Sequence, residues 1–116
     1  YIHPLIHIIR RGAFLYQTEY DWLDNIKSEI SNSIIDLCLN YIKTQGISNE
    51  PEFIIEITNC IFYFDHLNED ALIYKCKCLI LLKRHTLASN IYLKFVKEYR
   101  DIYGTEFTKT FHETIA

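Results

Sequence analysis

Histidine and cysteine are the side chains in this sequence best suited to binding a metal, yet their spacing provides no ligand set. His3 and His7 are four residues apart, as on one helical face, but Pro4 lies between them. No nearby Cys, Asp or Glu completes a site. Cys76 and Cys78 are separated by one residue, so on a helix their side chains point in different directions. We therefore predict no metal and no other cofactor.

The possible general bases lack the partners that catalysis requires. His85 lies beside Thr86 and His112 lies beside Glu113. Neither pair is accompanied by a glycine-rich elbow, an oxyanion cradle or a convergent nucleophile. The three glycines are isolated from one another, so they form no phosphate-binding loop. We predict that the chain is not an enzyme.

The charge balance argues against nucleic-acid binding by this chain. Twelve basic and fifteen acidic side chains give a formal net charge of -3, opposite to the basic surface of a protein that coats phosphates. Basic residues do gather between positions 75 and 100, where Glu98 and Asp101 dilute them. This pattern favours a solvated helix face, with a surface for an acidic partner as the alternative. The basic residues concerned are Lys75, Lys77, Lys83, Arg84, Lys94, Lys97 and Arg100.

Tyrosine and tryptophan are the candidates for contact with a partner. Tyrosine is amphipathic and enriched where protein surfaces meet, and we select Tyr63, Tyr74 and Tyr103 as the candidate interaction surface. Trp22 follows a group of aromatic residues that favours packing of the N-terminal segment on the first helix, the alternative being a platform for stacking a ligand. That group consists of Phe14, Tyr16 and Tyr20.

The elements that position these side chains belong to a single small domain, residues 1–116. Hydrophobic residues make up 49% of the 116 positions and charged residues 23%, enough for one core. No apolar run approaches the roughly 20 residues of a membrane span, so we expect no membrane contact. The absence of methionine indicates a piece of a longer protein. Cysteines within apolar patterns favour free, packed thiols and a reducing, cytoplasmic location. They are Cys38, Cys60, Cys76 and Cys78.

Only three glycines and two prolines punctuate the chain, which favours an all-α fold with long helices. Apolar residues at steps of three and four predict a first helix over 20–45, ended by Gly46. A second helix is predicted from about Glu50, with Pro51 in its first turn. Together they form a first helix pair over 20–65, preceded by an N-terminal segment, 1–19.

A second helix pair is predicted over 69–102. Its first helix is capped by Asp65 or Asn68 and runs to about Lys83, whose charge complements the negative end of the helix. Its second helix carries an apolar stripe that reaches Ile102 and ends at Gly104. Residues 105–116 are predicted to form a short C-terminal capping helix. That helix carries Phe107 and Phe111, four residues apart.

The second pair has the length of a tetratricopeptide unit. Residues 69–102 span 34 positions, with Ala88 at the small-residue position of the second helix and Tyr92 one turn later. A small side chain there lets the two helices approach closely. The first pair is longer and lacks the motif. We therefore predict a tetratricopeptide-like fold of one regular and one degenerate pair with capping segments at both ends.

An ordered series of residues along nearly the whole chain resembles the bacterial transcriptional activator domain, a tetratricopeptide-like helical module of bacterial transcriptional regulators. Residues 11–15 resemble the start of that module, 65–71 its inter-repeat turn, and 88–104 its last helix and exit. Two positions depart from the family: Lys83 stands where a turn glycine is usual, and His66 where a proline is usual. The residues that carry the resemblance are Gly12, Phe14, Leu15, Trp22, Glu69, Ala88, Tyr92, Phe95 and Gly104.

This resemblance implies a protein-interaction module without catalytic residues. In regulators of this family the module mediates self-association or contacts a protein partner, and DNA is bound by a separate domain. DNA binding is therefore expected only through a domain outside this chain. The alternative is a generic helical-repeat scaffold of a signalling or membrane-associated protein with no role in transcription.

Overall fold

Helices account for all the regular secondary structure in the part of the chain that the structure describes. The computed structural model describes Ile6 and residues 21–116, with side chains from residue 27 onward in the first long helix. The predicted all-α class is confirmed. The helices are α2 (Asp21–Gln45), α3 (Pro51–Phe64), α4 (Glu69–Leu81), α5 (His85–Tyr103) and α6 (Phe111–Ile115).

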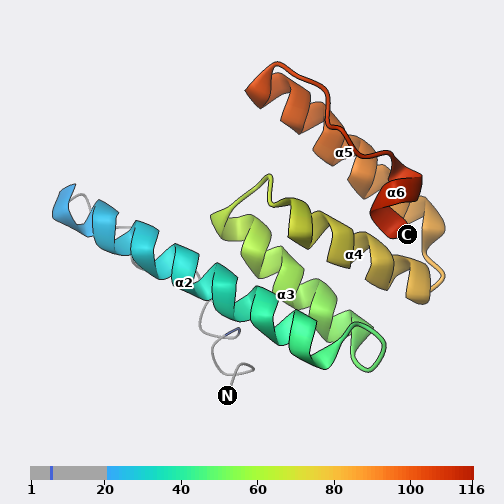
Figure 1. Ribbon diagram of the computed structural model, residues 1–116, viewed down its shortest axis with the longest axis horizontal. Coiled ribbons are helices and arrows are strands. Elements are labelled where there is room, and N and C mark those ends of the chain that lie inside the picture. The colour runs from blue at the N-terminus through green and yellow to red at the C-terminus, as the bar shows by residue number, and fades with distance from the viewer. Residues whose placement is uncertain (1–5, 7–20) are drawn as a thin grey trace.

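Helices α2 to α5 lie side by side in the order of the sequence, each antiparallel to its neighbour (Figure 1). Helix α3 packs on both α2 and α4, and α4 packs on both α3 and α5. The short α6 returns to pack against α4 as well. Within the described residues, no helix combines the length and apolar character needed to cross a membrane.

Helix α4 separates two hydrophobic clusters because opposite sides of it are buried. Cys78 belongs to a largely aliphatic cluster formed with α2 and α3, to which Ile6 also contributes. Cys76 belongs to a second cluster, which includes Phe95 and Phe107. The two thiols, two residues apart on a helix, therefore pack in different cores, as their spacing predicts.

Most helices begin or end at the glycine, proline and capping residues that the sequence predicts. Gly46 follows α2 with a φ of 73°, and its N–H donates to the Ile42 carbonyl at 2.8 Å. Pro51 begins α3. Of the two predicted caps of α4, Asn68 takes the role, since its Oδ1 accepts from the Ala71 N–H at 2.9 Å.

The end of α4 differs from the prediction. The helix ends at Leu81 rather than near Lys83, so the cationic ending lies beyond its last turn. Lys83 has a φ of 60°, in the left-handed region. Its N–H donates to the Ile80 carbonyl at 2.9 Å, and the Arg84 N–H donates to the Leu79 carbonyl at 2.8 Å. These bonds form a Schellman motif, in which a glycine usually occupies the position of Lys83.

The C-terminal segment also differs from the prediction. Phe107 lies in the loop before α6, not on the same helix as Phe111. Thr110 and Glu113 form a capping box at the start of α6, with both reciprocal hydrogen bonds 3.1 Å long. Phe107 is buried by the path of the loop, because residues 105–110 run back along α5 before α6 begins (Figure 1).

The apolar stripe of α5 is shorter than predicted. Ala88 and Phe95 are buried, and Tyr92 and Tyr99 are half-buried. Ile102, however, is 65% exposed. The helix projects past the end of α4 here, so the last turn of the stripe has no neighbouring helix to cover it (Figure 1).

Candidate functional site

The residues that carry the family resemblance are mainly structural where the structure describes them. Ala88 is fully buried, and its carbonyl lies 3.8 Å from Cys76 Sγ on α4. Glu69 is exposed in the first turn of α4, where its charge favours the positive helix end. Gly104 ends α5 with a φ of 72°. Gly12, Phe14 and Leu15, and the side chain of Trp22, lie outside the described residues.

The four cysteines are free, buried thiols. Burial raises the pKa of Cys38 to about 12, and the neighbouring Cys60 adds to this shift. Burial likewise raises the pKa values of Cys76 and Cys78 to about 11. At neutral pH these groups stay protonated, which makes them poor nucleophiles and poor metal ligands. In the described part of the chain, no three His, Cys, Asp or Glu residues are grouped to hold a metal ion; His3 and His7 lie outside it.

The three selected tyrosines differ in exposure. Tyr63, near the end of α3, is 52% exposed, and Tyr103, at the end of α5, is 58% exposed. Tyr74 is half-buried and packs against the aliphatic cluster. More than half of the surface of Tyr63 and of Tyr103 is thus exposed, whereas much of Tyr74 lies in the core.

An open groove crosses α3, α4 and α5. It has a volume of about 270 Å³. Apolar and polar side chains both line it, and the apolar ones, which we call its floor, include the buried Leu72 and Phe95. The apolar residues are Phe62 of α3, Leu72 of α4, and Ile91 and Phe95 of α5; the polar residues are Asn59, His66, Lys75, Lys94 and Glu98. We call this site the α3–α5 groove.

Lys75 is held in place inside the α3–α5 groove. Its Nζ donates to Asn59 Oδ1 at 2.7 Å and lies 5.7 Å from the centre of the Phe62 ring. The side chain is partly shielded from water, and this burial lowers the pKa of Lys75. A negative charge on Cys76 would oppose that shift, and the positive charge of Lys94 adds to it. The groove therefore contains a preorganised cation with a second cation close enough to repel it.

Lys94 completes this cationic pair from the opposite side of the groove. Its side chain is exposed, and it makes no hydrogen bond or ion pair with any described residue. Glu98, one turn later on α5, also lines the groove. It makes no ion pair with Lys75 or Lys94. The two lysines thus keep hydrogen-bond donors available to an incoming acceptor.

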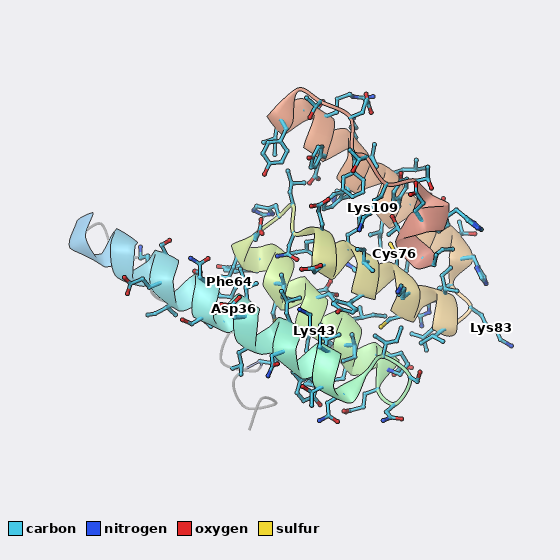
Figure 2. All side chains as sticks on the ribbon, viewed as in Figure 1. Asp36, Lys43, Phe64, Cys76, Lys83 and Lys109 are labelled. Atoms are coloured by element: carbon cyan, nitrogen blue, oxygen red, sulfur yellow. The ribbon has the colours of Figure 1, made fainter. Side chains whose placement is uncertain are left out.

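The other side of α5 is covered by the C-terminal segment. The Phe107 ring centre lies 5.1 Å from that of Phe95 and 5.2 Å from that of Tyr99. The Tyr92 hydroxyl donates to the Lys109 carbonyl at 2.6 Å, which fixes the loop before α6. Figure 2 shows Lys109 beside α5 and close to α6, and Lys83 pointing outward at the α4–α5 turn. One side of α5 is therefore closed by the chain itself, while the groove side is open.

Sequence reasoning found the groove only in part. It singled out Lys75 and Lys94 within a basic set, but not the apolar floor beneath them. A local signal exists in the spacing of Ile91, Phe95 and Glu98, which places them on one face of α5. Comparison with family models, curated proteins and solved structures found no match to this chain.

Proposed function

We propose that this chain is a non-catalytic protein-interaction module with a tetratricopeptide-like arrangement, belonging to a bacterial transcriptional regulator. It acts by assembly, binding a sister copy or another protein through its helical surface. The observation that carries the interaction role is the open α3–α5 groove, whose lining combines apolar side chains with two lysines that retain hydrogen-bond donors. The regulatory role rests on the sequence resemblance.

Two packing features support the tetratricopeptide-like arrangement. Ala88 lies at a close approach between α4 and α5, as a small residue does in the second helix of such a unit. Helix α6 packs against α4, the position that the first helix of a following repeat would take. A terminal cap of this kind fits the requirement that a repeat array end in a closing element.

The buried thiols support a non-catalytic role in a reducing cytoplasm. With pKa values raised to about 12 for Cys38 and about 11 for Cys76 and Cys78, they suit packing better than nucleophilic catalysis. In this proposal DNA is contacted by a domain outside this chain, as the sequence resemblance implies, and the net charge of -3 argues against phosphate binding by the chain itself.

The interaction role is tested by sedimentation velocity over a range of concentrations and by titration with labelled peptide pools of acidic, neutral and basic composition. Concentration-dependent dimerisation, or saturable binding of at least one pool at the groove, is expected. A chain that stays monomeric and binds none of the three pools contradicts the interaction role.

The regulatory role is tested separately by sequencing the parent gene on both sides of this segment. A DNA-binding module next to it is expected. Flanks that encode a membrane span or a catalytic domain, with no DNA reader, contradict the transcriptional role. The chain would then be a helical-repeat scaffold of another kind.

A further inference from the structure

We infer that the α3–α5 groove binds an acidic peptide segment that inserts one large apolar side chain between α3 and α5. This inference rests on the proposed interaction role and names the chemistry of the partner. It is carried by two features of the groove, the apolar floor and the paired lysines, and by the way the chain covers the opposite side of α5.

The size and floor of the groove favour a side chain over a small-molecule ligand. Its volume of about 270 Å³ lies just below the roughly 300–1,000 Å³ typical of small-molecule sites. Phe62, Ile91 and Phe95 line it with apolar surface from two helices. One phenylalanine or leucine from a peptide would bury this surface without having to desolvate a large polar group.

The charges of the groove favour acidic residues on either side of that apolar residue in the peptide. Lys75 has three ammonium hydrogens, of which one is bonded to Asn59. The other two, and those of Lys94, have no hydrogen-bond partner among the described residues. A carboxylate placed between the two lysines would accept charge-assisted hydrogen bonds and relieve their mutual repulsion. A basic peptide would increase that repulsion, and a neutral one would leave it.

The C-terminal segment provides an internal example of how such a cover binds. A stretch without regular structure, residues 105–110, runs along α5 and inserts Phe107 among aromatic rings. It is fixed by the hydrogen bond from Tyr92 to its backbone and by the ion pair between Arg100 and Glu106. This covered side offers rings, a hydroxyl and one exposed arginine, which pairs with an acidic residue of the segment, whereas the groove side offers two lysines. The expected occupant of the groove is therefore a similar extended segment with acidic residues beside its apolar anchor.

The test uses the 116-residue chain and three fluorescein-labelled peptide pools. Each pool has one phenylalanine or leucine at its centre, flanked by Asp and Glu, by Asn and Gln, or by Lys. A fourth, acidic pool with alanine at the centre controls for charge alone. Fluorescence anisotropy is expected to show tightest binding of the acidic pool with an apolar centre, and weaker binding as salt concentration rises.

A charge reversal in the groove has a matched control on the same helix. Lys94→Glu should weaken binding of that pool by about tenfold or more, because it replaces a cation near the peptide carboxylates with an anion. Lys97 is also exposed on α5 but does not line the groove. Lys97→Glu makes the same change in net charge and should weaken binding by about twofold or less. Unchanged melting midpoints confirm that both variants are folded.

The outcomes separate this inference from the proposed function. Equal binding of the acidic and neutral pools, or equal effects of Lys94→Glu and Lys97→Glu, overturns the acidic partner but leaves a protein-interaction module. Binding of the alanine-centred pool as tight as that of the apolar-centred pool overturns the anchor. Failure of every pool to bind overturns the groove as a peptide site, and if the chain is also monomeric, the interaction role falls with it.

Discussion

The two sides of helix α5 carry different side chains, and only one of them is covered by the C-terminal segment. On one side, Tyr92 and Tyr99 meet Phe107 of the C-terminal segment, with ring centres 6.4 and 5.2 Å apart. On the other side, Ile91 and Lys94 face the open α3–α5 groove. The covered side is rich in aromatic rings and also carries an exposed ion pair, in which Arg100 of α5 lies 3.4 Å from Glu106 of the covering segment. The open side combines apolar surface with cations.

This difference indicates which kind of peptide segment can pack on each side of α5. Aromatic rings and a tyrosine hydroxyl are satisfied by a segment with apolar anchors and backbone carbonyls, and residues 105–111 supply both. Lysine ammonium groups require acceptors as well. Phe95 takes part in both sides, since it lines the groove and also contacts Phe107. The two sides are therefore joined through one buried ring.

The substitution with the largest expected effect should disrupt the packing of α5 on α4, and with it both sides of α5. Ala88 is fully buried where α5 meets α4, so Ala88→Glu would force a longer, charged side chain into a closed contact. We expect a loss of about 4 kcal/mol or more in the free energy of unfolding, enough to unfold a small domain. Urea denaturation monitored by circular dichroism measures it. Leu87→Glu, one residue earlier and 44% exposed, is the control; an unchanged midpoint for Ala88→Glu would contradict the close packing of α5 on α4.

The next effect separates the covered side from the open one. Phe107 is 8% exposed and contacts three rings, so Phe107→Ala should cost about 3 kcal/mol of unfolding free energy. Acidic-peptide binding at the groove should change little while the chain stays folded, because Phe107 does not line the groove. Leu93→Ala, at a position that is 58% exposed, should cost far less. A loss of unfolding free energy below about 1 kcal/mol for Phe107→Ala would contradict the close packing of the C-terminal segment on α5.

A smaller effect concerns the turns at the two ends of α5. Lys83 and Gly104 both have positive φ values, 60° and 72°. Lys83→Gly should therefore stabilise the chain by about 1 kcal/mol, and Gly104→Lys should destabilise it by a similar amount. Open space surrounds the position where a Cβ would be added to Gly104, so the cost there comes from the backbone alone. Thermal unfolding of the two variants should give shifts of opposite sign, and shifts of the same sign would refute the left-handed turn at Lys83.

Much of the helical framework could be predicted from the sequence because its punctuation is sparse and local. Gly46, Pro51 and Gly104 act through their own backbone preferences, which no distant contact needs to reinforce. Asn68 caps α4 through a hydrogen bond to a residue three positions away. The periodic spacing of apolar residues then fixed the helix faces, since burial of Ile54, Ile57 and Ile61 follows from their positions on α3.

The features that escaped prediction depend on neighbours distant in sequence. Periodicity marks Ile102 as apolar but does not reveal that α4 is too short to cover it. Phe107 and Phe111 have helical spacing, yet only the loop path across α5 explains the burial of Phe107. At Lys83 the six-residue Schellman hydrogen bonds impose a left-handed turn on a residue that does not favour it. The α3–α5 groove is formed by three helices together, so no single pattern encodes it.

The smallest expected effect is the pH dependence of the covered side. The Glu113 carboxylate accepts from the Thr110 N–H, and this hydrogen bond lowers the pKa of Glu113 below its usual 4.5. A lowered folded-state pKa contributes stability that is present above the unfolded value and is lost as pH falls through the folded value. Glu113→Gln keeps an acceptor in the capping box but removes the charge. Its melting midpoint should lie slightly below that of the wild type at about pH 6, and the difference should shrink as the pH falls below 4.5 and through the lower folded-state pKa. The control is a Thr110→Ala background, in which the capping box is absent and Glu113→Gln should produce no such pH dependence. A pH-dependent difference that persists in this background would assign the effect to another contact of Glu113 rather than to the capping box.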